Sequence, residues 1–456
     1  MRFIADLHIH SKYSRATSKD MNLEELDRWA DDKGILVMAT GDFTHPQWLT
    51  EIKEKLEPVE PGLFKLKDSL KKKTIKGTLA DTRFILTVEI SGIYSRGGKT
   101  RRIHNLIFAP DIKTAETINT QLSWIGNLKS DGRPILGLDA EELAKIVINT
   151  NPEAVIVPAH AWTPWFSVFG SMSGFDSIEE CFGKYADKIF AVETGLSSDP
   201  LMNWRLSKLD NVALISNSDS HSLQKIGREA NIFDTGLSYK GIIEAIKSGI
   251  PNMRTSDVPN IDDKNFRTSD VQKLNQSAFV ATIEFFPEEG KYHFDGHRVC
   301  DIVLSPEESK KHNGICPKCG KKLTIGVMNR VEQLADRKIE ARSQGNYHEY
   351  AHCVPFYNLI SLDEIIAEAS GVGTASKKVK AEYENMIKAF GSELKILLET
   401  PEEQMAGAVN SQIIEGIKRV RQGRVKIAAG YDGVYGKVSI FDEKEQKKSE
   451  SQKSLF

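Results

Sequence analysis

The sequence predicts an α/β protein whose first 255 residues form a barrel of about seven strands. Short apolar segments rich in Val, Ile, Leu and Ala alternate with helix-compatible segments, which is typical of βα units and a mostly parallel sheet. Polar residues follow several apolar segments, as they do in barrels whose strand ends carry the chemistry. An open doubly wound sheet is the alternative, but no Gly-x-Gly-x-x-Gly motif follows the first strand. The expected strands lie in segments 3–10, 35–43, 83–90, 104–110, 154–160, 189–195 and 212–220.

The composition is that of an ordinary globular protein. The chain has 456 residues, is 40% hydrophobic and carries a net charge of −2, which excludes a disordered chain, a collagen-like chain and a generally basic nucleic-acid binder. No apolar stretch approaches the roughly 20 residues of a membrane-spanning helix, and the first residues lack the features of a signal peptide. Three of the five cysteines lie within 20 residues, which favours metal binding over a disulfide framework. We therefore expect a cytoplasmic protein without a membrane partner.

Four further regions follow the predicted catalytic domain of residues 1–255. Residues 256–280 are polar and contain Pro and Asn, which is typical of a linker. Residues 281–330 hold a Cys/His cluster, and we expect a zinc-binding domain there. Helical patterns predominate in residues 331–440, which we expect to form a helical DNA-binding domain with a terminal hairpin, whereas the charged residues 441–456 are typical of a disordered tail.

Histidines and carboxylates recur at the ends of the predicted strands. The first strand ends in His8-x-His10, and alternate residues of a strand face the same side. A lone histidine after a strand is more often structural than a ligand, but the recurrence favours one cluster of nitrogen and oxygen metal ligands. The candidate metal ligands are His8, His10, Asp42, His45, Glu89, His104, His160, Glu193, Asp219 and His221.

This pattern resembles the polymerase and histidinol phosphatase (PHP) domain. The resemblance implies a distorted seven-stranded βα barrel with two to three divalent ions, which would be Zn, Mn or Mg. It also implies that one ion is held by the catalytic residues His8, His10, Glu89 and Asp219. Glu89 would bridge to a second ion on His104 and His160, and His221 would belong to a third. Neighbouring divalent ions of this kind promote phosphoester hydrolysis.

The third site departs from the family pattern. Many members read Thr-Asp-His after the second strand, whereas this chain reads Gly-Asp-Phe-Thr-His-Pro at 41–46. Asp42 or His45 would then replace a ligand, and the third site would be weak or altered. The expected histidine after the first motif is also absent, and Lys12 and Arg15 stand in that loop, where they would meet a phosphate.

A second set of ligands predicts a structural zinc site. His297-x-x-Cys300 is followed, after fifteen residues, by Cys316-x-x-Cys319 and a glycine, which is the spacing of a zinc ribbon. His293 competes for the fourth place, but the spacing of His297 mirrors the second pair. A closed four-ligand site is structural, so this zinc would stabilise a small domain.

Basic loops and a glycine turn suggest a DNA substrate. Lysines crowd the insertion 65–76, and Arg101 and Arg102 lie between Glu89 and His104, where they would contact phosphates. Gly371 and Gly373 join two helical segments in a turn that resembles a helix-hairpin-helix, although a helix C-cap explains these glycines equally well.

The combination resembles the endonuclease Q family over roughly residues 1–436. The resemblance rests on the segments GDFTHP at 41–46, KYHFDGH at 291–297, CPKCGKKLTIGV at 316–327 and NRVEQLADR at 329–337. It implies a metal-dependent DNA repair endonuclease that cuts the strand 5′ to uracil, hypoxanthine, xanthine or an abasic site. Selecting such a base requires its extrusion from the helix into a pocket. Trp162, Trp165 and Phe166 would stack beside the base, or they form a structural aromatic loop.

The last five residues, QKSLF, fit the peptide by which bacterial repair proteins dock on the sliding clamp. Gln452, Leu455 and Phe456 are the expected clamp-binding residues. This motif would indicate a bacterial source and an enzyme associated with the nucleoid.

Two other functions compete with this interpretation. The first is a PHP phosphoesterase that acts on small phosphate esters or DNA 3′ ends. The second is a helicase-associated DNA-binding adaptor that has lost catalysis, against which the nearly complete ligand sets of the first two ions argue.

Overall fold

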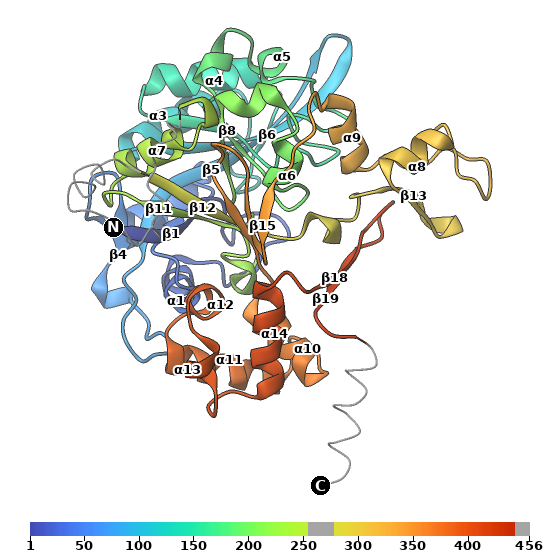
Figure 1. Cartoon of the computed structure of the whole chain (residues 1–456). Coiled ribbons are helices and arrows are strands. Elements are labelled where there is room, and N and C mark those ends of the chain that lie inside the picture. The colour runs from blue at the N-terminus through green and yellow to red at the C-terminus, as the bar shows by residue number, and fades with distance from the viewer. Residues whose placement is uncertain (254–277, 443–456) are drawn as a thin grey trace.

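The structure is a computed structural model that describes residues 1–253 and 278–442. Its centre is a mixed sheet of 13 strands, from which helices extend on several sides (Figure 1). Every segment that was expected to hold a strand contains one. These strands are β1 (Arg2–Asp6), β2 (Val37–Ala39), β5 (Arg83–Arg96), β6 (Lys99–Ala109), β8 (Val155–Pro158), β9 (Ala191–Glu193) and β10 (Ala213–Ile215), and β11 (Ala230–Asp234) follows them.

The strands surround one apolar interior. Side chains from β1, β2, β5, β6, β8, β9, β10 and β11 pack into a single buried cluster that includes Phe3, Leu106 and Phe233. Ladders join β11, β1, β2, β5, β6 and β8 in that order, and β9 pairs only with β10. In the described residues no ladder joins β8 to β9 or β10 to β11, so the expected barrel is not closed by backbone pairing. A side-chain hydrogen bond connects the end of β10 to β11, because Asn231 Oδ1 accepts from Ser216 N at 3.0 Å.

The sheet is mixed, and the expectation of a mostly parallel sheet was wrong. Strands β5 and β6 form a long antiparallel hairpin whose turn is Gly97-Gly98, with φ of 62° and 71°. Consecutive left-handed residues suit a tight hairpin turn and favour glycine. Because the hairpin extends past the rest of the sheet, Glu89 and His104 lie within strands, not at a strand end and a strand start as expected.

Helices cover the outside of the strands. Helix α1 begins after Asn22, whose side chain accepts from Glu25 N, and it ends at Gly34. Such an N-cap satisfies a backbone donor that has no partner within the helix. The helices of this region are α1 (Leu23–Lys33), α2 (Pro46–Lys55), α3 (Ile112–Ser123), α4 (Ala140–Thr150), α5 (Ile178–Phe182), α6 (Pro200–Asn203) and α7 (Tyr239–Ser248).

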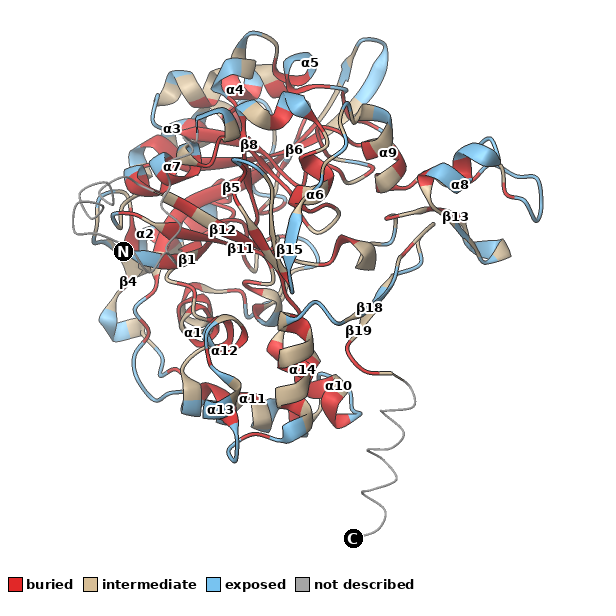
Figure 2. Ribbon diagram, viewed as in Figure 1, coloured by how far each residue is buried: buried red, intermediate tan, exposed pale blue. Residues whose placement is uncertain are grey.

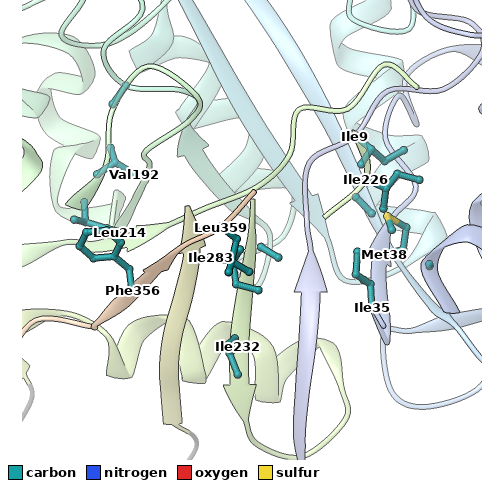
Figure 3. Packing of buried hydrophobic residues seen from close by; sticks show 14 of the residues in the cluster. Ile9, Ile35, Met38, Val192, Leu214, Ile226, Ile232, Ile283, Phe356 and Leu359 are labelled. Carbon is teal, nitrogen blue, oxygen red and sulfur yellow. The ribbon is translucent and has the colours of Figure 1, made fainter. Parts of the chain in front are cut away.

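Later strands extend the same sheet. Strand β12 (Ala278–Glu284) pairs with β11, and β17 (Phe356–Asn358) pairs with β12. Ile283 and Phe356 belong to the buried cluster that includes Ile232 of β11 (Figure 3). Residues 342–358 therefore belong to the sheet, although we expected them in the helical domain. Short strands complete it: β3 (Leu56–Pro58), β4 (Phe64–Leu66), β7 (Ile135–Leu136), β15 (Arg342–Gln344) and β16 (Tyr347–Glu349).

The cysteine-rich region projects to one side of the barrel (Figure 1). It contains β13 (Asp295–His297), β14 (Ile302–Leu304) and α8 (Pro306–Lys311), and α9 (Val327–Leu334) returns the chain to the barrel. The terminal hairpin of β18 (Lys426–Ala428) and β19 (Lys437–Ser439) contacts this region, where Tyr431 bridges to Phe294.

The C-terminal helices lie below the central sheet, next to α1 (Figure 1). Figure 2 shows buried residues along these helices, whereas α8 and β15 are largely exposed. The helices are α10 (Leu362–Ser370), α11 (Lys377–Phe390), α12 (Glu393–Leu398), α13 (Glu402–Met405) and α14 (Ser411–Arg421). Within residues 1–253 and 278–442, no helix combines the length and apolarity that crossing a membrane requires.

Candidate metal centre

Four side chains from three parts of the chain meet beyond the end of β1. His8, His10, Glu89 and Asp219 each offer one ligand atom, and these atoms lie within 4.8 Å of one another. His10 Nε2 is 3.0 Å from Asp219 Oδ1 and 3.3 Å from Glu89 Oε2. Both histidines follow β1, which ends at Asp6, yet their rings converge as the alternation predicted. We call these four residues the first ligand group.

A second ligand group shares Glu89. His104 Nδ1 is 2.6 Å from Glu89 Oε1, and His160 Nε2 is 3.0 Å from the same oxygen. The three ligand atoms of Glu89, His104 and His160 also lie within 4.8 Å of one another. The two oxygens of one buried carboxylate therefore face two clusters of imidazole nitrogens. This is the arrangement in which a carboxylate bridges two metal ions.

Burial and neighbouring charges shift the pKa values of several residues of the site. Burial opposes protonation of His8, but the carboxylates of Glu193 and Asp219 raise the pKa of His8 well above its ordinary value. Burial would raise the pKa of Glu89, but His104 and Arg133 hold it well below its usual range. Burial lowers the pKa of His104 to about 4, so this imidazole is neutral and ready to bind a cation.

The residues fit divalent cations. Imidazole nitrogen and carboxylate oxygen are the ligands that zinc and manganese accept. His8 Nε2 is buried and has no hydrogen-bond partner among residues 1–253 and 278–442, and it faces Asp219 Oδ1 at 3.7 Å and Glu89 Oε2 at 3.8 Å. A buried polar atom without a partner is costly unless a ligand satisfies it. The backbone is also strained here, because the non-glycine residues Asp42, His160 and Asp219 adopt positive φ.

Asp42 and Glu193, which we expected among the ligands, lie behind His10 and His8, on the side away from the first ligand group. Glu193 Oε1 is 3.0 Å from His8 Nδ1, and Asp42 Oδ1 is 3.1 Å from His10 Nδ1. Asp42 also accepts from Ser11 N at 2.6 Å. Carboxylates in such positions fix the tautomer of a metal-binding histidine and turn its other nitrogen toward the ion.

The residues expected at a third ion do not gather. His45 caps α2 and stacks on Tyr13 with ring centroids 4.3 Å apart. His221 Nδ1 is 3.0 Å from the backbone oxygen of Asp219, and its ring is 4.4 Å from that of His10. Among the described residues, His45, His221 and Asp42 form no group of converging ligand atoms.

One charged residue of the site was missed by sequence reasoning. Arg133 Nη1 donates to Glu89 Oε2 at 3.0 Å, so this guanidinium touches the shared carboxylate. Glu89 in turn raises the pKa of Arg133. A lone arginine in a polar loop has no periodicity or spacing that would have singled it out.

The aromatic residues after His160 differ in their surroundings. Trp162 is fully buried and donates to Asn203 Oδ1 at 2.8 Å, so it serves as part of the core. Trp165 is 37% exposed and lies edge-on to Tyr292, which precedes the cysteine-rich region. Phe166 adopts a φ of 63° and its ring contacts that of His104, with centroids 4.7 Å apart. Of these three aromatic residues, Trp165 and Phe166 thus differ from Trp162 in lying outside the core.

The loop that carries these aromatics is held from both sides. Arg330 of α9 donates to the backbone oxygens of Phe169 at 3.0 Å and Phe175 at 3.1 Å. Arg101 contacts Gly174 O, and its guanidinium lies 4.0 Å from the ring centroid of Phe175. We expected Arg101 to bind DNA, but in this structure it binds the loop.

The other residues expected to contact DNA differ in their exposure and in their contacts. Arg15 is 77% exposed and Arg102 lies over Phe166, both near the site. Lys12 is instead paired with Glu51 at 2.8 Å. Gly371 ends α10 with a φ of 66°, as a C-cap glycine does, and its turn leads to α11 through Gly373.

The lysines of segment 65–76 are largely neutralised. Lys72 pairs with Glu25 at 2.6 Å, and Lys76 pairs with Asp31 at 2.6 Å, both on α1. Lys71 pairs with Asp68 at 3.2 Å. These contacts fix the insertion on the barrel and give it a structural role.

The cysteine-rich region brings its predicted ligands together. The ligand atoms of His297, Cys300, Cys316 and Cys319 lie within 4.8 Å of one another, and among the described residues His293 is not in this group. Burial raises the pKa of the Cys316 thiol, but the backbone N–H groups of Lys318 and Cys319 lower it to about 6. A thiolate is the form that binds zinc. The expected clamp-binding residues, Gln452, Leu455 and Phe456, lie outside the described residues.

Sequence comparisons relate the chain to two curated proteins and one domain family. Residues 361–424 match the model of the MJ0043 C-terminal domain. MJ0043 of Methanocaldococcus jannaschii is 32% identical over 288 residues, 62% of this chain, and the match spans only 32% of that protein's length. YqxK of Bacillus subtilis is 26% identical over 454 residues, which cover 96% of this chain and 99% of that protein.

Two solved structures share the architecture over nearly the whole chain. A lesion-specific endonuclease from Pyrococcus furiosus, PfuEndoQ, superimposes with a TM-score of 0.77 and 28% identity, covering 97% of this chain and 96% of its own. An endonuclease Q bound to a 27-mer duplex with an abasic lesion at its active site superimposes with a TM-score of 0.76 and 29% identity, covering 97% and 98%. The likeness therefore includes the cysteine-rich and helical regions as well as the barrel.

Proposed function

We propose that this chain, which belongs to the endonuclease Q family and is a hydrolase of DNA phosphodiester bonds, nicks DNA 5′ to a deaminated base or an abasic site. The observation that carries the proposal is the pair of ligand groups that share Glu89. The DNA-bound relative, which holds an abasic lesion at its active site, supports DNA as the substrate.

The two ligand groups would each hold one divalent ion. When bound, such ions neutralise the charge on the phosphate and activate water near neutral pH. Glu89 would bridge them, Asp219 would complete the first site, and His104 and His160 would complete the second. Asp42 and Glu193 contact Nδ1 of His10 and His8, and they would keep the Nε2 atoms of these histidines available to hold an ion.

Lesion recognition would take place beside the aromatic loop. Phe166 packs on the ring of His104, and the preceding residue, Trp165, is partly exposed. An extruded base stacks favourably on such side chains. We expect uracil, hypoxanthine, xanthine and abasic nucleotides as substrates, because the resemblance to the family implies them.

The cysteine-rich region would hold a structural zinc, and the C-terminal QKSLF would tether the enzyme to a bacterial sliding clamp. The first part is supported by the converging atoms of His297 and the three cysteines. The second part rests on the sequence alone. The test compares clamp binding by a fluorescent QKSLF peptide and by the same peptide with Phe456→Ala. Binding by the first peptide alone would support the tether, and equal binding would contradict it.

The function is tested with duplexes that carry one uracil, hypoxanthine, xanthine or abasic site. We expect a single internal nick 5′ to the lesion with Mn²⁺ or Mg²⁺, and no nick with chelator or on undamaged DNA. Glu89→Gln should abolish nicking, whereas Glu153→Gln, an exposed control before β8, should not change it. Release of terminal phosphate alone would favour a small-phosphoester hydrolase, and binding without any cleavage would favour an adaptor.

A further inference from the structure

We propose that Arg133 is a catalytic residue that binds the scissile phosphate of the DNA. This inference rests on the proposed function, and it identifies a substrate contact at the same site. The observation behind it is the position of the guanidinium, whose Nη1 lies 3.0 Å from Glu89 Oε2. Glu89 is the carboxylate that both ligand groups share, so Arg133 reaches the centre of the site.

The loop of Arg133 is fixed against the metal centre. Gly132 N donates to Tyr13 O at 3.1 Å, and Pro134 O accepts from Ser91 N at 3.0 Å. Gly132 also packs against Asp42 so closely that an added Cβ would lie 2.3 Å from Asp42 Oδ2. The arginine is therefore held by backbone contacts on both sides, and little ordering is left for the substrate to impose.

Arg133 lies on the open side of the site. The side chain of Glu89 is fully buried, but those of Arg133 and Asp219 are 28% and 23% exposed. Within the described residues, only Nη1 of the guanidinium donates to another group. The other N–H donors of its planar fork remain for phosphate oxygens, which arginine binds in a bidentate manner.

The positive charge of Arg133 suits the hydrolysis of a phosphodiester. Hydrolysis of a phosphodiester places additional negative charge on the non-bridging oxygens, and a fixed cation stabilises that charge. Arg133 supplies a permanent positive charge beside the carboxylate that the two ligand groups share. Asp131 also pairs with Arg15 at 3.3 Å, which places a second, exposed arginine at the rim for a neighbouring phosphate.

The alternative is a purely structural role, in which Arg133 only holds Glu89 in place. The two roles differ in what happens to the metal. If Arg133 only positions Glu89, an enzyme without Arg133 should bind less metal, because Glu89 belongs to both ligand groups. An arginine that binds phosphate would leave the metal content unchanged and lower the rate of cleavage.

The test compares full-length wild type, Arg133→Ala, Arg133→Lys and the control Lys129→Ala, an exposed residue of the same loop. Single-turnover nicking of lesion DNA and metal content are measured for each, and guanidinium is added to rescue Arg133→Ala. We expect Arg133→Ala to be slower by about 10²–10³-fold, as for other lost transition-state contacts, with Arg133→Lys between it and wild type. Metal content should be unchanged, and guanidinium should restore part of the rate.

Each outcome decides one claim. An unchanged rate for Arg133→Ala, or a lower rate together with lost metal and no guanidinium rescue, overturns the role of Arg133 and leaves the proposed function intact. A wild-type protein that nicks none of the lesion duplexes overturns the proposed function, and the role of Arg133 falls with it.

Discussion

Lys33 Nζ lies 2.6 Å from Glu393 Oε2, and this buried ion pair joins α1 of the barrel to α12 of the helical region. Both side chains are 4% exposed. Glu393 also accepts from Tyr383 Oη at 2.7 Å and from Leu362 N at 3.2 Å. One carboxylate thus connects three helices of the C-terminal region to α1, which packs on the central sheet.

Removing this cation should be costly. We expect Lys33→Ala to lower the free energy of unfolding by about 3–5 kcal/mol, because it leaves the Glu393 carboxylate buried without its partner. Lys53→Ala is the matched control, since its pair with Glu116 is about half exposed on both sides and should contribute no more than about 1 kcal/mol. Urea unfolding measures both, and similar losses for the two variants would refute the importance of the buried pair.

Gly132 should tolerate no side chain. A Cβ at this position would lie 2.3 Å from Asp42 Oδ2 and 2.5 Å from Ser14 Oγ, so Gly132→Ala must displace the loop of Arg133 or the Asp42–His10 pair. We expect nicking to slow by about 10²-fold, the effect of a displacement of about 1 Å in an active site. Gly137→Ala, where an added Cβ meets no atom within 4 Å, should retain the wild-type rate. Equal rates for the two variants would contradict the packing described.

Glu284 should make stability depend on pH. Burial raises the pKa of Glu284 from 4.5 to about 8, and Asp199 adds to the shift. Between these values the unfolded chain releases a proton that the folded protein keeps, so stability falls as the pH rises from about 4.5 to about 8. Glu284→Gln removes this group, and its Tm relative to wild type should rise across that range. Glu142→Gln, which is 52% exposed, is the control, and a Tm difference that does not change with pH would contradict this explanation.

The cysteine cluster should bind one structural zinc. We expect Cys319→Ser to lose about one zinc ion per chain and to lower the Tm, because metal binding contributes directly to folding at a closed site. His312→Ala changes an exposed histidine of the same region that lies outside the ligand group and should keep the metal. Atomic emission and thermal unfolding measure the two effects. Unchanged zinc in Cys319→Ser would exclude this cluster as the site.

The sequence predicted that the candidate metal ligands converge, because several of them follow strands, although Glu89 and His104 lie within strands. His8 and His10 come after a buried strand, and His160 follows another, so the fold brings them to one end of the barrel. It did not predict that Asp42 and Glu193 lie behind the histidines. Spacing along a strand does not distinguish a ligand from the carboxylate that orients it.

Other features depend on contacts that no local pattern encodes. Arg133 reaches Glu89 because Gly132 packs on Asp42, and these residues are far apart in the chain. The sequence did not reveal that β5 and β6 form an antiparallel hairpin. A short glycine turn joins these strands, which we had expected to be parallel. The strands of residues 342–358 are short and partly polar, so their pairing with β12 was not apparent from hydrophobicity.

The proposed function depends on Glu89 holding two ions together, one in each of the two ligand groups that share it. Anomalous diffraction from crystals grown with Mn²⁺ tests it most directly. We expect one peak among His8, His10, Glu89 and Asp219 and a second among Glu89, His104 and His160. Crystals with manganese at other sites and no peak beside Glu89 would contradict it.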